Sequence, residues 1–233
     1  MSTTSTHVIL PLTQQNLGYD PLKDFAAIGL VARAPNMLIA SPQLRVASVA
    51  ELIAHAKRNP GTLNFASRGQ GTITHLIGEL FLMRAGIRAE HVPYKSGVQS
   101  FAELNSGHVH FLFDSIVWSL PQIREGKLKG LAVTSAQRSE LAPDIPTISE
   151  AGLPGFEAST WFGLSAPAST PEPIMNRLRE ALGRALARKE LTDRFAVLGA
   201  ESSFVDRTEF ERLIVEDTKK WRDVILKAGL QNQ

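Results

Sequence analysis

Apolar positions follow two different periods along the chain. Compact apolar runs of the kind found in buried strands occupy 25–32, 36–42, 63–67, 88–94, 108–114, 128–135 and 159–167. Between them, apolar residues recur every three or four positions, the period of an amphipathic helix, over 48–61, 72–83, 97–107, 115–127, 170–190 and 206–228. Strands and helices that alternate in this way predict an α/β fold.

Several of the expected helices carry their own start and stop signals. Ser48 with Glu51, and Asp206 with Glu209, have the spacing of a capping box, in which the two side chains satisfy backbone N–H groups of the first turn. Gly86 and Gly229 follow the last apolar position of two helices, where a left-handed residue ends a helix most easily. Thr170 is expected to start another helix, with proline at its first position.

The stretch LNFASRGQGTITHLIGEL, 63–80, places a glycine loop between a strand and a helix. Gly69 and Gly71 permit a sharp turn and a close approach to the backbone, and Thr72 is expected to cap the helix that follows. Unpaired N–H groups and the positive end of the helix dipole would point at one spot, which favours an anion. The alternative is a tight turn that needs glycine for its geometry alone.

Composition excludes several classes of protein. The chain has 233 residues, 43% of them hydrophobic and 21% charged, as in an ordinary globular protein of one large or two small domains. Its net charge of +2 is spread without a basic cluster, so we expect no nucleic-acid partner. The absence of cysteine excludes disulfides, thiolate zinc sites and cysteine nucleophiles. No apolar run suits a membrane span, and the first 15 residues do not have the pattern of a signal peptide.

The motifs of common enzymes are missing from the sequence. The glycine loop is followed by neither the lysine of a P-loop nor the third glycine of a dinucleotide fingerprint. Ser67, His75 and Asp114 are the residue types of a hydrolase triad, but there is no nucleophile elbow to position them. His108 and His110 would share a strand face without a carboxylate partner, so they are expected to be ordinary half-exposed histidines. We therefore expect no catalytic residues, no metal and no cofactor.

Seven motifs, in order, resemble one family over nearly the whole chain. They are GYDPLKDFAAIGLVA, GQGTITHLIGELF, HVPYKSG, FLFDS, GKLKGLAVTS, PDIPTISEAGLPGFE and WFGLSAPASTP. The chain is similar here to the tripartite tricarboxylate transporter substrate-binding proteins, also called TctC-like or Bug-type receptors. The resemblance implies a periplasmic, non-enzymatic solute receptor of the type II periplasmic-binding-protein (Venus-flytrap) architecture. It also implies that the ligand is a small organic carboxylate and that the partners are membrane transporter subunits. The receptor is expected to be monomeric when the protein is complete.

The resemblance also implies a division into lobes and a set of ligand-binding residues. The first lobe would comprise 1–32 and 165–233, and the second lobe 33–164. The expected ligand-binding residues supply backbone donors, hydroxyl groups or charge, and they are Ser5, Thr6, Ser67, Arg68, Gly69, Gly71, Thr72 and Asp114. Trp118, Trp161 and Trp221 are expected in a core or at an interface between lobes.

Two of these residues have more than one interpretation. Arg68 stands where a small residue is expected, and it could point at solvent or hold a second ligand carboxylate in its charged fork. Asp114 ends a strand, where ligands gather in α/β lobes. Its carboxylate could accept hydrogen bonds from a ligand, from a bridging water, or from the N-terminus of the next helix.

Against the family pattern, the chain begins late. We expect the first lobe to be incomplete at its N-terminus, because the segment that normally opens it is not in this sequence, and we expect a weak receptor as a result. Two other classes stay open at this point. One is a cytoplasmic ligand-sensing domain, which the lack of a helix-turn-helix segment disfavours, and the other is a hydrolase or lyase that uses His75.

Overall fold

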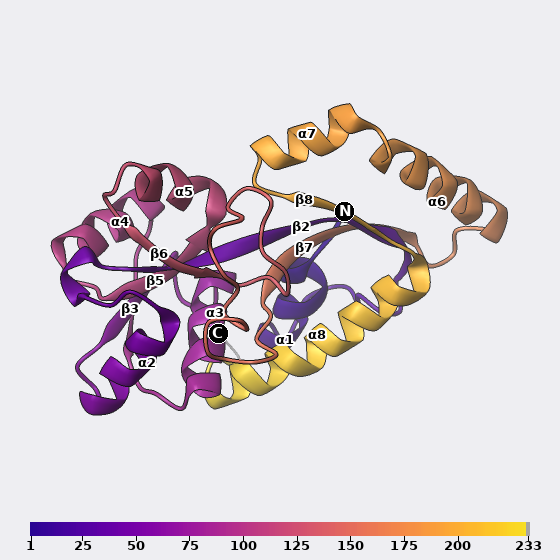
Figure 1. The fold of residues 1–233 in the computed structure, drawn as a ribbon. Helices are drawn as coiled ribbons and strands as arrows, with labels where there is room; N and C mark the ends of the chain where they lie inside the picture. Colours follow the sequence, from indigo (N-terminus) through magenta and orange to yellow (C-terminus); the bar gives the residue numbers. More distant parts are fainter. Residues whose placement is uncertain (232–233) are drawn as a thin grey trace. The chain divides into compact units, whose positions relative to one another are not determined.

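The computed structural model describes residues 1–231 and divides into two compact units. Unit 1 comprises Met1–Ala34 together with the chain from Thr160 onward, and unit 2 comprises Pro35–Ser159. The chain passes between them within two strands, β2 (Phe25–Ala40) and β7 (Ser159–Pro167) (Figure 1). Both units mix helices with strands, which confirms the α/β fold.

Unit 2 is organised by a sheet with the strand order β4-β3-β5-β2-β6. Strand β3 pairs in parallel with β4 and β5, whereas β2 pairs antiparallel with β5 and β6. The strands other than β2 are β3 (Asn64–Ser67), β4 (Glu90–Pro93), β5 (Phe111–Ser115) and β6 (Lys129–Val133). The helices are α2 (Val49–Arg58), α3 (Ile73–Ala85), α4 (Gly97–Ser106) and α5 (Ile116–Arg124), with a 3₁₀ turn, η2, at Pro42–Leu44.

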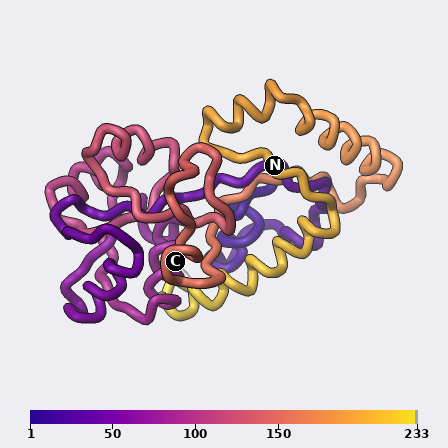
Figure 2. The backbone as a smooth tube through the Cα atoms, viewed as in Figure 1, coloured from indigo at the N-terminus to yellow at the C-terminus, as the bar shows by residue number. Residues whose placement is uncertain are grey.

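In unit 1, helices pack on both sides of a smaller group of strands. Strand β7 lies between β1 (Ser2–Thr3) and β2, and β8 (Glu201–Val205) pairs antiparallel with β2. Helices α6 (Glu172–Leu186) and α7 (Lys189–Val197) contact β8, while α8 (Arg207–Lys227) contacts a π-helical turn, η1 (Ser5–Ile9), and α1 (Leu10–Thr13). In Figure 2, α8 runs along one side of the strands of unit 1, and α6 and α7 lie on the other side.

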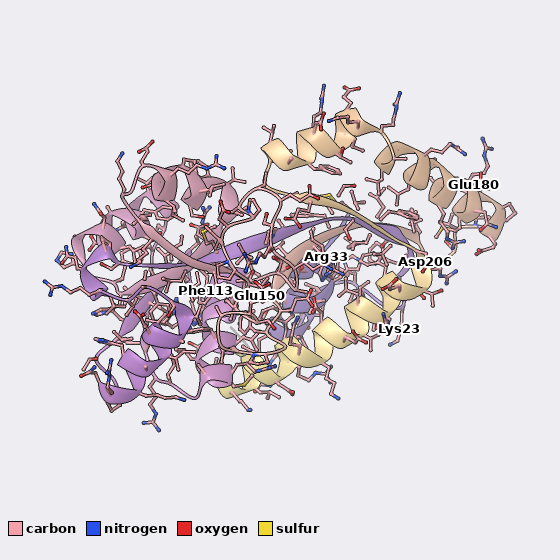
Figure 3. All side chains as sticks on the ribbon, in the orientation of Figure 1. Lys23, Arg33, Phe113, Glu150, Glu180 and Asp206 are labelled. Carbon is pink, nitrogen blue, oxygen red and sulfur yellow. The ribbon has the colours of Figure 1, made fainter. Side chains whose placement is uncertain are left out.

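Both predicted N-cap side chains accept the backbone N–H three residues further on, but the reciprocal contact of the second capping box is absent among the described residues, where Glu209 Oε1 accepts from Arg212 Nη2 instead. The Glu51 N–H donates to Ser48 Oγ over 3.2 Å, and Glu51 Oε2 accepts from the Ala47 N–H at 2.7 Å. At the start of α8, Asp206 Oδ1 accepts from the Glu209 N–H at 3.0 Å, and Figure 3 labels Asp206 at this helix end. Gly86 ends α3 with φ +61°. Helix α6 begins one residue later than expected, with Pro171 rather than Thr170 at its N-cap.

Two strand predictions were wrong in extent. The runs 25–32 and 36–42 form a single strand, β2, that continues through Pro35. Pro35 lies between the segment of β2 that pairs with β8, which ends at Arg33, and the segment that pairs with β5, which begins at Asn36, so neither of these two ladders needs its missing N–H. The run 108–114 becomes a strand only from Phe111, so His108 and His110 precede it and do not share a strand face.

Each unit has a core of its own. In unit 2 the Phe81 ring packs edge-on against Phe111, Phe113 and Phe156, and all four side chains are buried. In unit 1 the buried Trp161 packs edge-on against Phe210, at 5.2 Å between ring centres, and Trp221 is also fully buried. Each buried aromatic side chain stabilises the fold by about 1.5–3 kcal/mol. Trp118, by contrast, is 60% exposed and belongs to neither core.

Candidate functional site

The glycine loop of 67–72 connects β3 to α3 in unit 2. Gly69 has φ +123° and Gly71 has φ +72°, conformations that cost other residues free energy. The chain can therefore turn from strand to helix within a few residues. This part of the site is local, and its geometry follows directly from the sequence.

Side chains beside the loop already hold several of its backbone donors. The Arg68 N–H donates to Thr74 Oγ1 at 3.2 Å. The Gly69 N–H donates to Ser67 Oγ, and the Gly71 N–H donates to His75 Nδ1, both at 3.1 Å. Thr72 occupies the N-cap position, but the expected side-chain cap is absent, because its hydroxyl donates to the Gly69 carbonyl at 2.7 Å. The loop is thus rigidified by its own hydrogen bonds before any ligand is considered.

Other donors of the same turn are not used. Within 1–231, the backbone N–H groups of Gln70, Ile73 and Thr74 have no hydrogen-bond acceptor. Ile73 and Thr74 are the first two residues of α3, where the helix dipole is positive. An anion placed at this turn would meet N–H groups that the fold leaves available.

Strand register brings Arg68 to Asp114. Phe65 of β3 pairs with Phe111 of β5 in parallel, so the residues three positions further along both strands are level with each other. Arg68 Nε lies 3.1 Å from Asp114 Oδ2, and Arg68 Nη2 lies 2.8 Å from Asp114 Oδ1. This is a two-point ion pair between a guanidinium and a carboxylate.

Both residues therefore have partners within the fold. Arg68 is not simply a solvent-facing side chain, since two of its nitrogens bind Asp114. Asp114 is buried and also accepts from the Ser115 N–H, at the N-cap of α5, over 2.6 Å. Burial raises the pKa of Asp114, while Arg68 and the Ser115 N–H act in the opposite direction. The carboxylate therefore depends on its partners to stay charged.

Two stacked histidines lie behind the loop. The His75 and His91 rings are 3.5 Å apart at 10° between their planes. His91 Nε2 is 2.6 Å from Ser67 Oγ, and His75 Nε2 faces Glu79 Oε1 at 3.4 Å. Burial and the neighbouring His75 lower the pKa of His91 to about 4, so this ring is neutral at neutral pH.

These contacts do not form a hydrolase triad. Ser67 bonds to His91 rather than to His75, and Asp114 bonds to Arg68. His108 is exposed and lies 2.7 Å from Glu103, while His110 contacts Asn64 at 2.8 Å. In the described part of the chain, no group of three histidine or acidic side chains is placed to hold a metal ion.

The hydroxyl donors expected near the N-terminus, in unit 1, behave differently from each other. Thr6 is tied into its own turn: its Oγ1 accepts from the Thr3 N–H at 3.0 Å and contacts His7 Nδ1 at 3.1 Å. Ser5 is exposed, and its hydroxyl has no partner among the described residues. Of the two side chains, Ser5 is the one available to a ligand.

A pocket of about 360 Å³ in unit 2 was not anticipated from the sequence. It lies between α4 and α5, and Arg68 forms part of its wall together with Val98, Phe101 and Trp118. The available signal was the spacing of Val98, Phe101, Ala102 and Asn105, which share one face of α4. Trp118, which was expected in a core or at an interface, is 60% exposed and lines this pocket instead.

No helix in the described part of the chain is both long and apolar enough to cross a bilayer. Comparison with known proteins gives a consistent result over the chain. A protein from the tcbD–tcbE intergenic region of Pseudomonas sp. strain P51 is 33% identical over 213 residues, which is 91% of this chain. The chain spans 63% of the length of that relative.

Solved structures share the fold over 96–100% of this chain. A protein of R. palustris solved with adipate is 33% identical and has a TM-score of 0.80, covering all of this chain and 78% of that one. MatC from Rhodopseudomonas palustris with bound malate is 31% identical with a TM-score of 0.74, over 96% of this chain and 77% of that one. The periplasmic binding protein BugD is 30% identical with a TM-score of 0.75, over 98% and 77%.

The family model described as the tripartite tricarboxylate transporter family receptor, TctC, matches residues 1–230. This match includes the glycine loop, the Arg68–Asp114 pair and both units. Members of the family are solute-binding receptors, which accords with a site made of hydrogen-bond donors rather than of a nucleophile and a base. The chain belongs to the tripartite tricarboxylate transporter receptor family.

Proposed function

We propose that this protein captures a small organic carboxylate in the periplasm and delivers it to a tripartite tricarboxylate-type transporter. The observation that carries the proposal is the turn from the glycine loop into α3, where the N–H groups of Gln70, Ile73 and Thr74 have no acceptor among the described residues. The family match and the two similar structures with adipate and malate support the same chemistry.

The ligand's carboxylate binds at this turn. Each charge-assisted hydrogen bond that it accepts contributes about 1.5–3 kcal/mol, and the helix dipole adds a smaller favourable term. The hydrogen bonds that already fix the loop reduce the entropy lost on binding, because the backbone has little freedom left to lose. Ser67, Gly69, Gly71 and Thr72 thus shape the site.

The two lobes are 1–32 with 165–233 and 33–164, a division supported by the two compact units. Ser5 contributes a ligand hydroxyl donor from the first lobe, and Thr6 holds the turn that presents it. The protein works as a monomeric receptor and catalyses no reaction. Its periplasmic location is supported by its similarity to the periplasmic binding protein BugD.

The test is isothermal titration of the purified protein with malate and adipate, comparing Gly71→Val with Gly61→Val. Both glycines have φ above +70°, so valine strains the backbone in both variants. Gly61 has nothing within 4 Å of the new side chain and lies in a turn before β3. Gly71→Val should weaken carboxylate binding by about tenfold or more, the equivalent of one lost charge-assisted bond, whereas Gly61→Val should leave it unchanged.

Equal affinities in the two variants, or no binding of any carboxylate to the wild-type protein, would contradict the proposal. Native mass spectrometry adds an independent readout, because a co-purified organic acid of unchanged mass is expected for a receptor. A chemically altered product would instead indicate an enzyme.

A further inference from the structure

The pocket between α4 and α5 is lined largely by side chains of two helices, whereas the glycine loop offers backbone N–H donors. Val98 is 79% exposed and Trp118 is 60% exposed, and together with Phe101 they line a space of about 360 Å³. Exposed apolar side chains that gather around a hollow are one mark of a ligand-binding groove. A volume of this size lies in the range of small-molecule sites, which are mostly apolar with a few polar groups.

The polar group in this pocket is the free edge of Arg68. Its Nε and Nη2 bind Asp114, but Nη1 has no partner among the described residues, and the side chain is 39% exposed. The guanidinium is therefore held in place by one carboxylate while it keeps N–H donors for another. Lys127 at the pocket wall adds a positive charge, although it also lies 2.7 Å from Glu125.

Gly97 preserves this arrangement. A side-chain carbon at this position would lie 3.1 Å from Arg68 Nη2 and 3.5 Å from Asp114 Oδ2. A larger first residue of α4 would make the guanidinium move by a few tenths of an ångström from its place beside Asp114. The same glycine is part of the pocket wall, so the ion pair and the pocket are built together.

We propose that this pocket binds the apolar body of a monocarboxylate, an aryl or alkyl carboxylate whose charged group is held at Arg68 Nη1. The inference rests on the proposed function, because it assumes a receptor for organic carboxylates, and it adds a carboxylate position at Arg68 to the one proposed at the turn into α3. The apolar body lies against Val98, Phe101 and Trp118, and the carboxylate lies at the only described guanidinium in the pocket wall. A ligand without an apolar body would leave these surfaces exposed to water.

The first experiment compares phenylacetate, acetate and phenylacetamide by isothermal titration against the wild-type protein. Phenylacetate should bind about tenfold more tightly than acetate or better, because its ring leaves water on binding. Phenylacetamide has the same shape without the charge, and it should bind more weakly than phenylacetate. Tryptophan emission should shift to shorter wavelength on phenylacetate binding, since Trp118 is the tryptophan exposed to solvent while Trp161 and Trp221 are buried.

The second experiment fills the pocket. Ala102 lines it from an exposed position of α4, and Ala54 is exposed on α2 outside it. Ala102→Leu should weaken phenylacetate binding about tenfold, while Ala54→Leu should leave it within about twofold of the wild type. Trp118→Phe should lose the emission shift on addition of phenylacetate, because the other two tryptophans are buried.

The outcomes separate the two proposals. If malate or adipate binds as proposed but phenylacetate binds no better than acetate, the pocket inference is wrong and the receptor function stands. Phenylacetate binding that Ala102→Leu does not weaken would also overturn the inference, because the ligand would then lie elsewhere. If no carboxylate binds to the wild-type protein, both proposals fail.

Discussion

Arg68 and Asp114 are the residues whose roles depend most on each other. Asp114 is buried, and Arg68 supplies two of its hydrogen bonds. Arg68→Met should lower the free energy of unfolding by about 1–3 kcal/mol near neutral pH, because it leaves a buried carboxylate unpaired. The figure is below that of a fully buried pair, since the Arg68 side chain is 39% exposed and partly screened by water. Urea denaturation measures the change.

The pH dependence of that loss has a definite sign. Burial raises the pKa of Asp114, and removing Arg68 raises it further, so the folded variant binds a proton that the unfolded chain releases. Stability is then regained as pH falls through the folded pKa of Asp114. The double variant Arg68→Met with Asp114→Asn should recover most of the loss at about pH 7. A deficit of equal size in acid and at neutral pH would show that Asp114 is not the cause.

His91 provides a second pH effect, of opposite sign. Its pKa is about 4 in the folded protein against an ordinary value of 6.5, so the unfolded chain binds the proton first as pH falls. The stability from the neutral ring is complete above pH 6.5 and is lost as pH falls from 6.5 towards 4. Because the His91 ring is only partly buried and water screens it, the effect should fall below the full 1.4 kcal/mol per pKa unit and be on the order of 1–2 kcal/mol. His91→Gln should remove this part of the slope.

Denaturation at a series of pH values checks this prediction, with His108→Gln as the exposed control. His7 and His110, whose pKa values are also lowered by burial, keep their contributions in both variants. If His91→Gln left the pH dependence of the free energy of unfolding unchanged, protonation of the stacked histidine pair would not affect stability. If His108→Gln, at an exposed histidine, removed as much of the pH dependence of stability as His91→Gln, burial of the ring would not be its cause.

At the scale of elements, two helical glycines serve different purposes. Gly78 of α3 lies against the Phe65 ring of β3, and a side-chain carbon there would come within 2.2 Å of it. Gly183 of α6 has its nearest atom, Phe204 Cζ, at 3.7 Å. Alanine stabilises a helix interior by up to about 1 kcal/mol relative to glycine, whereas overpacking costs about 1–3 kcal/mol.

Gly78→Ala should therefore lower the melting temperature, and Gly183→Ala should raise it or leave it unchanged. The two substitutions are chemically identical and both lie within helices, so thermal melts of the pair separate helix propensity from packing. A Gly78→Ala protein as stable as the wild type would show that α3 can move away from β3 at little cost. The close approach of this helix also positions the loop that precedes it.

The whole molecule consists of two units with separate aromatic cores, joined through β2 and β7. The glycine loop, the Arg68–Asp114 pair and the α4–α5 pocket all lie in unit 2, while Ser5 and Thr6 lie in unit 1. Because the chain spans 63% of the length of its Pseudomonas relative, the transport partners and the full substrate range are proposals about the whole protein.

Local features could be read from the sequence by itself. The N-caps of α2 and α8, the glycine that ends α3 and the turn of the glycine loop depend on contacts between residues a few positions apart. Their chemistry is decided by residue type and spacing, so the sequence predicted them. The order of the family motifs likewise identified the family, and the model match confirmed it.

The tertiary structure alone decided which distant side chains meet. Arg68 and Asp114 are 46 positions apart, and Ser67 and His91 are 24 apart, so strand register determines both contacts. The same holds for Trp118, whose exposure depends on how α5 lies beside α4. Residue type determines what a side chain can bind, but strand register and packing determine which partner is within reach. The distances between side chains of different strands are set only when the sheet has folded.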